Sequence, residues 1–126
     1  MKSLRRVALF ASALLVSLAA FAATVNWTAP TANTDGSAIP ATGPGSIASY
    51  RIEYGTCNGT AFGTKAGEIV VNAPALTGNT PPTAPGTWCY RMYAVNTFGV
   101  ESDPTNVVSK VIAPPKPNPP GNFTVL

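Results

Sequence analysis

Residues 87–96 read TWCYRMYAVN and carry the strongest strand signal in the sequence. The even-numbered side chains from Trp88 to Ala94 are all apolar, whereas the odd-numbered ones mix Cys, Arg, Tyr and Val. A period of two places alternate side chains on opposite faces of an extended strand. This stretch therefore predicts a long β-strand whose even-numbered face packs on a core.

Shorter segments of the same kind lie on both sides of it. They are 25–27, 49–55, 68–72 and 105–112. In 49–55, Tyr50, Ile52 and Tyr54 alternate with Arg51 and Glu53. A polar loop spans 31–46, and 13 prolines and 11 glycines interrupt the 126-residue chain too often for ordinary helices. Short strands joined by turns predict an all-β, antiparallel β-sandwich.

The composition excludes several kinds of active site. The chain has no histidine and two cysteines. Zinc sites of the His/Cys type, Ser-His-Asp triads and Cys-His pairs all need residues that the chain lacks. We expect no catalytic residues, no cofactor and no metal site, and we interpret Asp35, Glu101 and Asp103 as solvated surface charge.

Residues 1–22 have the pattern of a signal peptide. Lys2, Arg5 and Arg6 precede an apolar stretch, and Ala20-Phe-Ala forms a cleavage site before Ala23. The apolar stretch is short for a membrane span, although an uncleaved anchor is the alternative. We expect a signal-peptide helix and a mature protein that is periplasmic or secreted.

Cleavage would also remove three of the eight basic residues. Five cations would then face five carboxylates, so the mature chain is formally neutral. The remaining cations are scattered singly, whereas nucleic acids and acidic membranes attract basic stripes. We therefore expect no nucleic-acid partner, and no membrane association after cleavage.

Several landmarks in order resemble one family. Trp27-Thr-Ala-Pro, the run Tyr50-Arg-Ile-Glu-Tyr-Gly, and residues 90–106 are similar to strands B, C, F and G of a fibronectin type III domain. The resemblance covers about residues 25–112. It implies an immunoglobulin-like sandwich domain at 23–112, with Trp27 in its core.

Three features depart from that family. Trp88 stands where the family usually has the tyrosine of its tyrosine corner, so the usual hydroxyl bond would be lost or replaced by an indole N–H contact. A Pro-rich insertion around 79–85, after Leu76, would lengthen the loop before residue 87. The family's strand A has no counterpart in a mature chain that starts at Ala23.

The two cysteines indicate a disulfide, because exported domains fold in oxidising compartments. In the family, strands C and F are antiparallel neighbours, which implies that Cys57 lies near Cys89. Closing a loop of this size would stabilise the fold by about 3–4 kcal/mol. Free thiols and an intermolecular bridge are the alternatives.

The C-terminal segment 113–126 has two parts. Residues 113–120 contain five prolines, which predicts a stiff polyproline II linker, and 121–126 read GNFTVL. The second part resembles the opening strand A of a fibronectin type III domain, with Phe123 and Val125 as candidate donor-strand residues. It could be a disordered vestige of a second repeat, fold back onto its own domain, or dock into another molecule.

One surface is a candidate binding face. Arg51, Arg91 and Tyr93 should share the outward side of the predicted sheet. We expect a non-catalytic module that binds a protein or glycan in adhesion, at the cell surface or in the periplasm. The alternative is a structural subunit that forms homo-oligomers by donating residues 121–126.

Overall fold

The computed structural model describes residues 23–81 and 84–126, and its described part is all-β without a helix. The predicted signal-peptide helix at 1–22 lies outside the described residues. Within the described ranges, no helix has the length and apolar character needed to span a bilayer. Six strands follow in order: β1 (Ala23–Asn26), β2 (Ile47–Asn58), β3 (Ala61–Asn72), β4 (Thr77–Thr80), β5 (Gly86–Asn96) and β6 (Val108–Ile112).

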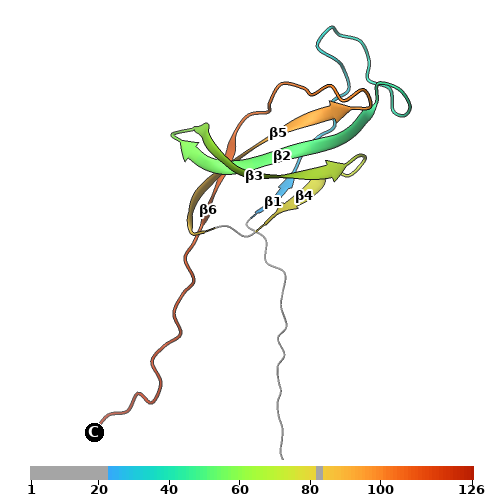
Figure 1. Ribbon diagram of the computed structural model, residues 1–126. Helices are drawn as coiled ribbons and strands as arrows, with labels where there is room; N and C mark the ends of the chain where they lie inside the picture. Colours follow the sequence, from blue (N-terminus) through green and yellow to red (C-terminus); the bar gives the residue numbers. More distant parts are fainter. Residues whose placement is uncertain (1–22, 82–83) are drawn as a thin grey trace, which may run out of the picture.

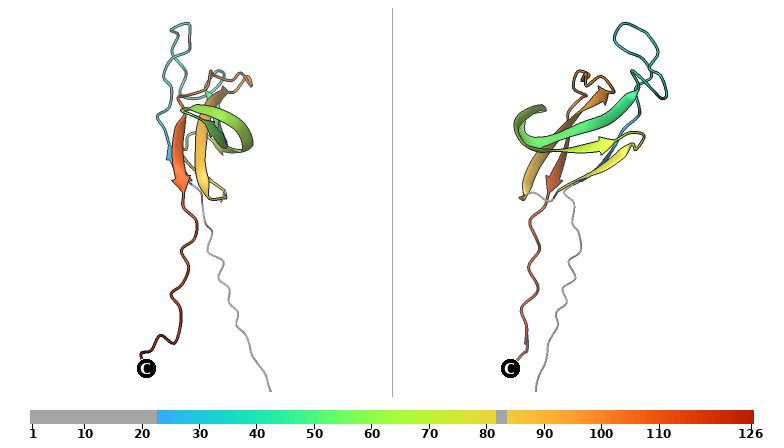
Figure 2. Two further views of the ribbon diagram at one scale, coloured as in Figure 1. Left: turned by 90° about the vertical axis from the view of Figure 1, so that its left-hand side faces the viewer. Right: turned by 45° about the vertical axis from the view of Figure 1, so that its right-hand side comes forward.

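The strands form two antiparallel sheets (Figures 1 and 2). The larger sheet has the order β3-β2-β5-β6, and the smaller one pairs β1 with β4. This arrangement is consistent with a β-sandwich and confirms the predicted all-β, antiparallel class. The smaller sheet has only two strands, so it covers the larger one incompletely.

The core lies on the inner face of the four-stranded sheet. Tyr50, Ile52 and Tyr90 are each 2 % exposed. The Trp27 ring lies 5.1 Å from that of Tyr50, centroid to centroid, and joins the two sheets. Tyr50 and Ile52 therefore share the inner face of the sheet, as the alternation in 49–55 predicts. Trp27, which was expected in the core, is only half-buried.

The β2–β3 hairpin is longer than the sequence predicts. Both strands have 12 residues and turn around Gly59, whose φ of 65° suits glycine. A bulge interrupts the β2–β3 register near Gly55, where an added Cβ would lie 2.0 Å from the Thr64 carbonyl oxygen. Glycine at 55 therefore allows the two backbones to approach.

Strand β4 corrects the predicted insertion. Residues 77–80 pair with β1, so the connection to β5 contains residues 81–85 and not 79–85. The sequence TGNT has no apolar residue and therefore gives no local signal for a strand. It forms a strand because Gly78 fits beneath Val71, whose Cγ2 lies 3.0 Å from a Cβ placed there, and because Thr80 is fully buried.

The strand predicted at 87–96 is confirmed almost residue for residue as β5, which begins one residue earlier at Gly86. At its start, the Trp88 indole N–H donates to the Ala84 carbonyl over 2.7 Å. Of the two alternatives for this position, loss of the hydroxyl bond or its replacement by an indole N–H contact, the structure shows an indole contact. The last strand is shorter than predicted and begins at Val108, although Thr105 N–H still bonds to the Met92 carbonyl.

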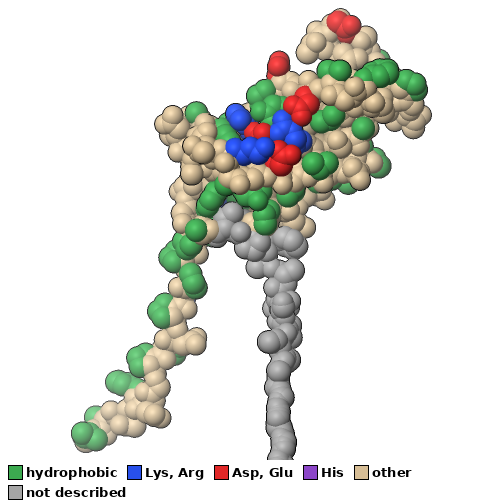
Figure 3. Space-filling view, viewed as in Figure 1, with side chains coloured by type: hydrophobic (Ala, Val, Ile, Leu, Met, Phe, Trp, Pro, Cys, Tyr) green, Lys and Arg blue, Asp and Glu red, His purple; other side chains and the backbone are tan. Residues whose placement is uncertain are grey.

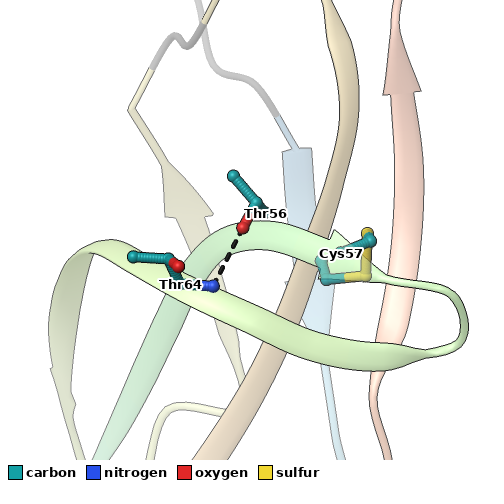
Figure 4. Close-up of a disulfide and its surroundings, with 4 residues drawn as sticks. Thr56, Cys57 and Thr64 are labelled. Atoms are coloured by element: carbon teal, nitrogen blue, oxygen red, sulfur yellow. Dashed lines mark hydrogen bonds between the residues drawn. A yellow bond between two sulfur atoms is a disulfide. The ribbon is translucent and has the colours of Figure 1, made fainter.

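The Cys57–Cys89 disulfide joins the end of β2 to the start of β5 (Figure 4). The two Cα atoms lie 5.2 Å apart, and Cys89 is 2 % exposed. Beside it, the Thr64 N–H donates to Thr56 Oγ1 over 2.8 Å and closes the hairpin bulge. The predicted intramolecular pairing is confirmed.

The C-terminal segment leaves the end of β6 and runs away from both sheets (Figures 1 and 2). None of residues 113–126 belongs to a strand, and every one of 113–126 is exposed. The segment therefore does not fold back onto its own domain as a strand A. Phe123 and Val125 are 96 % and 95 % exposed.

Candidate functional site

The structure brings Arg51, Arg91 and Tyr93 together on the outer face of the four-stranded sheet (Figure 3). Arg51 stands opposite Tyr93 in the β2–β5 register, and its guanidinium carbon lies 4.2 Å from the ring centroid. The guanidinium of Arg91 lies 4.1 Å from the ring of Phe62 on β3. Cation–π contacts of this kind hold both arginines flat on the sheet.

Glu53 lies at the centre of this face and is missing from the predicted set. Its side chain is 8 % exposed and accepts a 2.8 Å bond from Arg91 Nε and another from Arg51. Burial alone would raise the pKa of this carboxyl, but the two arginines outweigh burial and hold the pKa below its usual value. The cross-strand pair Glu53–Arg91 could have been found from the β2–β5 register.

Two more carboxylates complete the cluster, which we call the ion-pair face. The Glu101 carboxylate accepts two hydrogen bonds from Arg51, from Nε at 2.8 Å and from Nη2 at 2.9 Å. These bonds raise the pKa of the Arg51 guanidinium. Lys65 donates to Glu68 and lies 3.7 Å from Glu53. The cations of this face therefore already have partners of opposite charge.

The other predicted surface carboxylate with a defined contact is Asp35. It accepts bonds from the Ser37 N–H and hydroxyl, at 2.9 and 2.6 Å, which lowers its pKa. This is a turn within the loop 31–46. Across the described ranges 23–81 and 84–126, no three His, Cys, Asp or Glu side chains are grouped to hold a metal ion.

The second candidate site is the edge of β1 that faces away from β4. Trp27 N–H donates to the Leu76 carbonyl on the β4 side. Successive residues of a strand direct their backbone groups to opposite sides, so Thr24 and Asn26 direct theirs to the other edge. Within 23–81 and 84–126, β4 is the only strand that pairs with β1, which leaves that edge open.

A groove of about 370 Å³ lies along this open edge, between β1 and the β5–β6 side of the larger sheet. We call it the β1 groove. Its walls are formed by Val25, Asn26, Trp27, Thr28, Ile52, Tyr90, Arg91, Met92, Thr105, Asn106 and Val108.

Two buried polar atoms among these lining residues have no hydrogen-bond partner within the described structure: Trp27 Nε1 and the Tyr90 hydroxyl oxygen. Burial raises the pKa of Tyr90, and the nearby Thr80 opposes this weakly without forming a well-aligned bond. Buried polar groups without partners are rare and costly. The sequence does not predict the groove; its one signal for an open edge is that the fibronectin type III resemblance leaves no counterpart of strand A before residue 25.

The geometry is the only guide to function, because the comparisons identify no relative. No protein-family model matches the chain, and neither a curated protein nor a solved structure matches it.

Proposed function

We propose that this chain is an exported, non-catalytic interaction module of the fibronectin type III-like sandwich class, and that its β1 groove binds an extended segment of a protein. The observation that carries the proposal is the combination of an open strand edge with an apolar groove beside it. Addition of a strand to such an edge gives affinity through main-chain bonds and specificity through side-chain pockets.

The backbone supplies the first half of this recognition. The N–H and C=O groups of Thr24 and Asn26 are placed to bond to an incoming strand. A bound strand would thus pair groups that lack partners in the described domain.

The disulfide supports the proposed location. Cys57–Cys89 joins two neighbouring strands of a domain with few buried apolar residues. Such bonds form and persist in the periplasm and outside the cell. Together with the predicted signal peptide, this favours a periplasmic or secreted protein that begins at Ala23.

The ion-pair face has weaker support as a binding surface for a protein or glycan. Arg51 and Arg91 are already bonded to Glu53 and Glu101, so a charged ligand would have to displace internal partners. Tyr93 lies beneath the Arg51 guanidinium. We therefore assign this face chiefly to the stability of the larger sheet.

Selection from a phage-displayed library of random octapeptides tests the proposed function. The variant Asn26→Pro serves as the comparison, because it removes an N–H at the open edge and leaves the bonds to β4 in place. We expect selected peptides to carry apolar residues at alternate positions and to bind Asn26→Pro at least about tenfold more weakly. Equal binding to both proteins would refute the groove as the site.

A further inference from the structure

We propose that the natural occupant of the β1 groove is the segment 121–126 of a second copy of this chain. This inference rests on the proposed function of the groove as a strand-binding site. It adds the identity of the partner and predicts a homo-oligomer that grows from one copy to the next.

The segment has the side chains that the groove needs. Phe123 and Val125 are two residues apart, so they project from one face of an extended strand. Both are almost fully exposed, and Leu126 at the terminus is exposed as well. The segment 121–126 carries no charged side chain, and exposed apolar groups of this kind mark interaction sites.

The linker keeps the segment away from its own groove. Residues 113–120 include five prolines, which have no N–H to pair with a strand edge. In a polyproline II conformation these eight residues span ~25 Å. The structure shows them extended away from the domain (Figure 2).

Strand direction also favours a second copy. The segment leaves the domain at the pole where β6 ends and β1 begins (Figure 1). A strand antiparallel to β1 must enter at the opposite pole, which carries the loop 31–46 and the turn after β5. The next molecule along the extended tail presents that pole, whereas the chain's own tail would have to return along the whole domain.

In the bound state, Phe123 and Val125 would lie against the apolar wall formed by Val25, Ile52 and Met92. The backbone of the segment would pair with Thr24 and Asn26. Each copy then offers a tail at one pole and a groove at the other, which is a head-to-tail contact. Contacts of this kind build open chains unless the rotation closes a ring.

Light scattering coupled to size-exclusion chromatography of the exported full chain gives the first test. We expect assemblies whose mass rises with concentration, and a monomer for the double variant Phe123→Asp/Val125→Asp. The matched control Asn122→Asp/Thr124→Asp adds the same charge to the opposite face of the segment and should still assemble. A wild-type chain that is monomeric at all concentrations overturns the inference.

Mixing two variants gives the sharper test. The tail variant Phe123→Asp/Val125→Asp keeps an intact groove, and Asn26→Pro keeps an intact tail. Each should be monomeric alone, and together they should form a one-to-one heterodimer that cannot grow. If the mixture forms no heterodimer and the tail variant assembles as the wild type does, the partner is not this segment.

The octapeptide selection separates this failure from failure of the groove itself. If no heterodimer forms, but the tail variant still binds the selected peptides and Asn26→Pro does not, the groove binds strands and its partner is another protein. If neither variant binds peptides and no assembly forms, both the proposed function and the inference fail.

Discussion

The two sheets of this domain differ in how completely their strand edges and polar groups are paired. The four-stranded sheet has a disulfide between β2 and β5 and an outer face on which the charges pair internally. The two-stranded sheet has an open edge within the described residues, and the half-buried Trp27 that follows β1 has an indole nitrogen without a hydrogen-bond partner there. This contrast is the reason why we assign cohesion to the larger sheet and propose recognition at the smaller one.

Removal of the disulfide in the larger sheet should cause the largest loss of unfolding free energy. The double variant Cys57→Ser/Cys89→Ser should lose about 3–4 kcal/mol of unfolding free energy, because the unfolded chain gains the entropy of a loop spanning 32 residues. Urea denaturation of oxidised wild type and of the variant measures the loss. Equal urea midpoints for the two proteins would mean that the disulfide does not reduce the conformational entropy of the unfolded chain.

The hairpin bulge is the next target. In Gly55→Ala the new methyl group would overlap the Thr64 carbonyl, so β2 and β3 must separate. We expect a loss of about 1–3 kcal/mol in thermal or urea unfolding. Gly121→Ala is the control, since no atom lies within 4 Å of a Cβ placed there, and a comparable loss in the control would contradict the account.

Glu53→Gln should weaken the ion-pair face in a pH-dependent way. In the wild type, the pKa of the Glu53 carboxyl is lower in the folded state than in the unfolded state. The carboxylate therefore stabilises the fold at pH values above the unfolded-state pKa, and this stabilisation is lost as the pH falls through the folded-state pKa. We expect a loss of about 1–2 kcal/mol near pH 7 and a smaller difference from wild type near pH 3.

Urea titrations of both proteins at the two pH values provide the measurement. Glu101→Gln is the comparison, because this carboxylate is much more exposed than Glu53 and should matter less. A difference between wild type and Glu53→Gln that grows on acidification would reverse the predicted sign.

Changes in the tail should have the smallest effect on stability. At dilutions that keep the chain monomeric, Phe123→Asp/Val125→Asp should alter the unfolding free energy by less than about 0.5 kcal/mol, because these side chains touch nothing in their own domain. The same variant should abolish assembly. A large loss of monomer stability would show that the tail packs on its own sheet.

The sequence predicted the two central strands of the larger sheet, β2 and β5, well because they carry strong alternation, whereas residues 61–67 of β3 were not predicted. Residues 87–96 and 49–55 place Tyr90, Tyr50 and Ile52 in the core as expected. The disulfide pairing was predicted from the resemblance to the fibronectin type III family, which places the two cysteine-bearing strands side by side, and not from the local pattern.

The smaller sheet was harder to predict, because its stability comes from its neighbours and not from its own residues. Strand β4 contains no apolar side chain and depends on burial of Thr80 and on the fit of Gly78. The partners of Arg51 and Arg91 were missed for a related reason, since Glu53 becomes central only once β2 and β5 are in register. Tertiary context decides both features.

Hydrogen exchange at the backbone amides of β1, followed by NMR, tests the central claim most directly. In wild-type chain at assembling concentrations, the amides of Thr24 and Asn26 should exchange at least about tenfold more slowly than in Phe123→Asp/Val125→Asp. The Trp27 amide, which donates to Leu76, is the internal reference and should be protected in both. Equally fast exchange of Thr24 and Asn26 in the two proteins would contradict an occupied β1 groove.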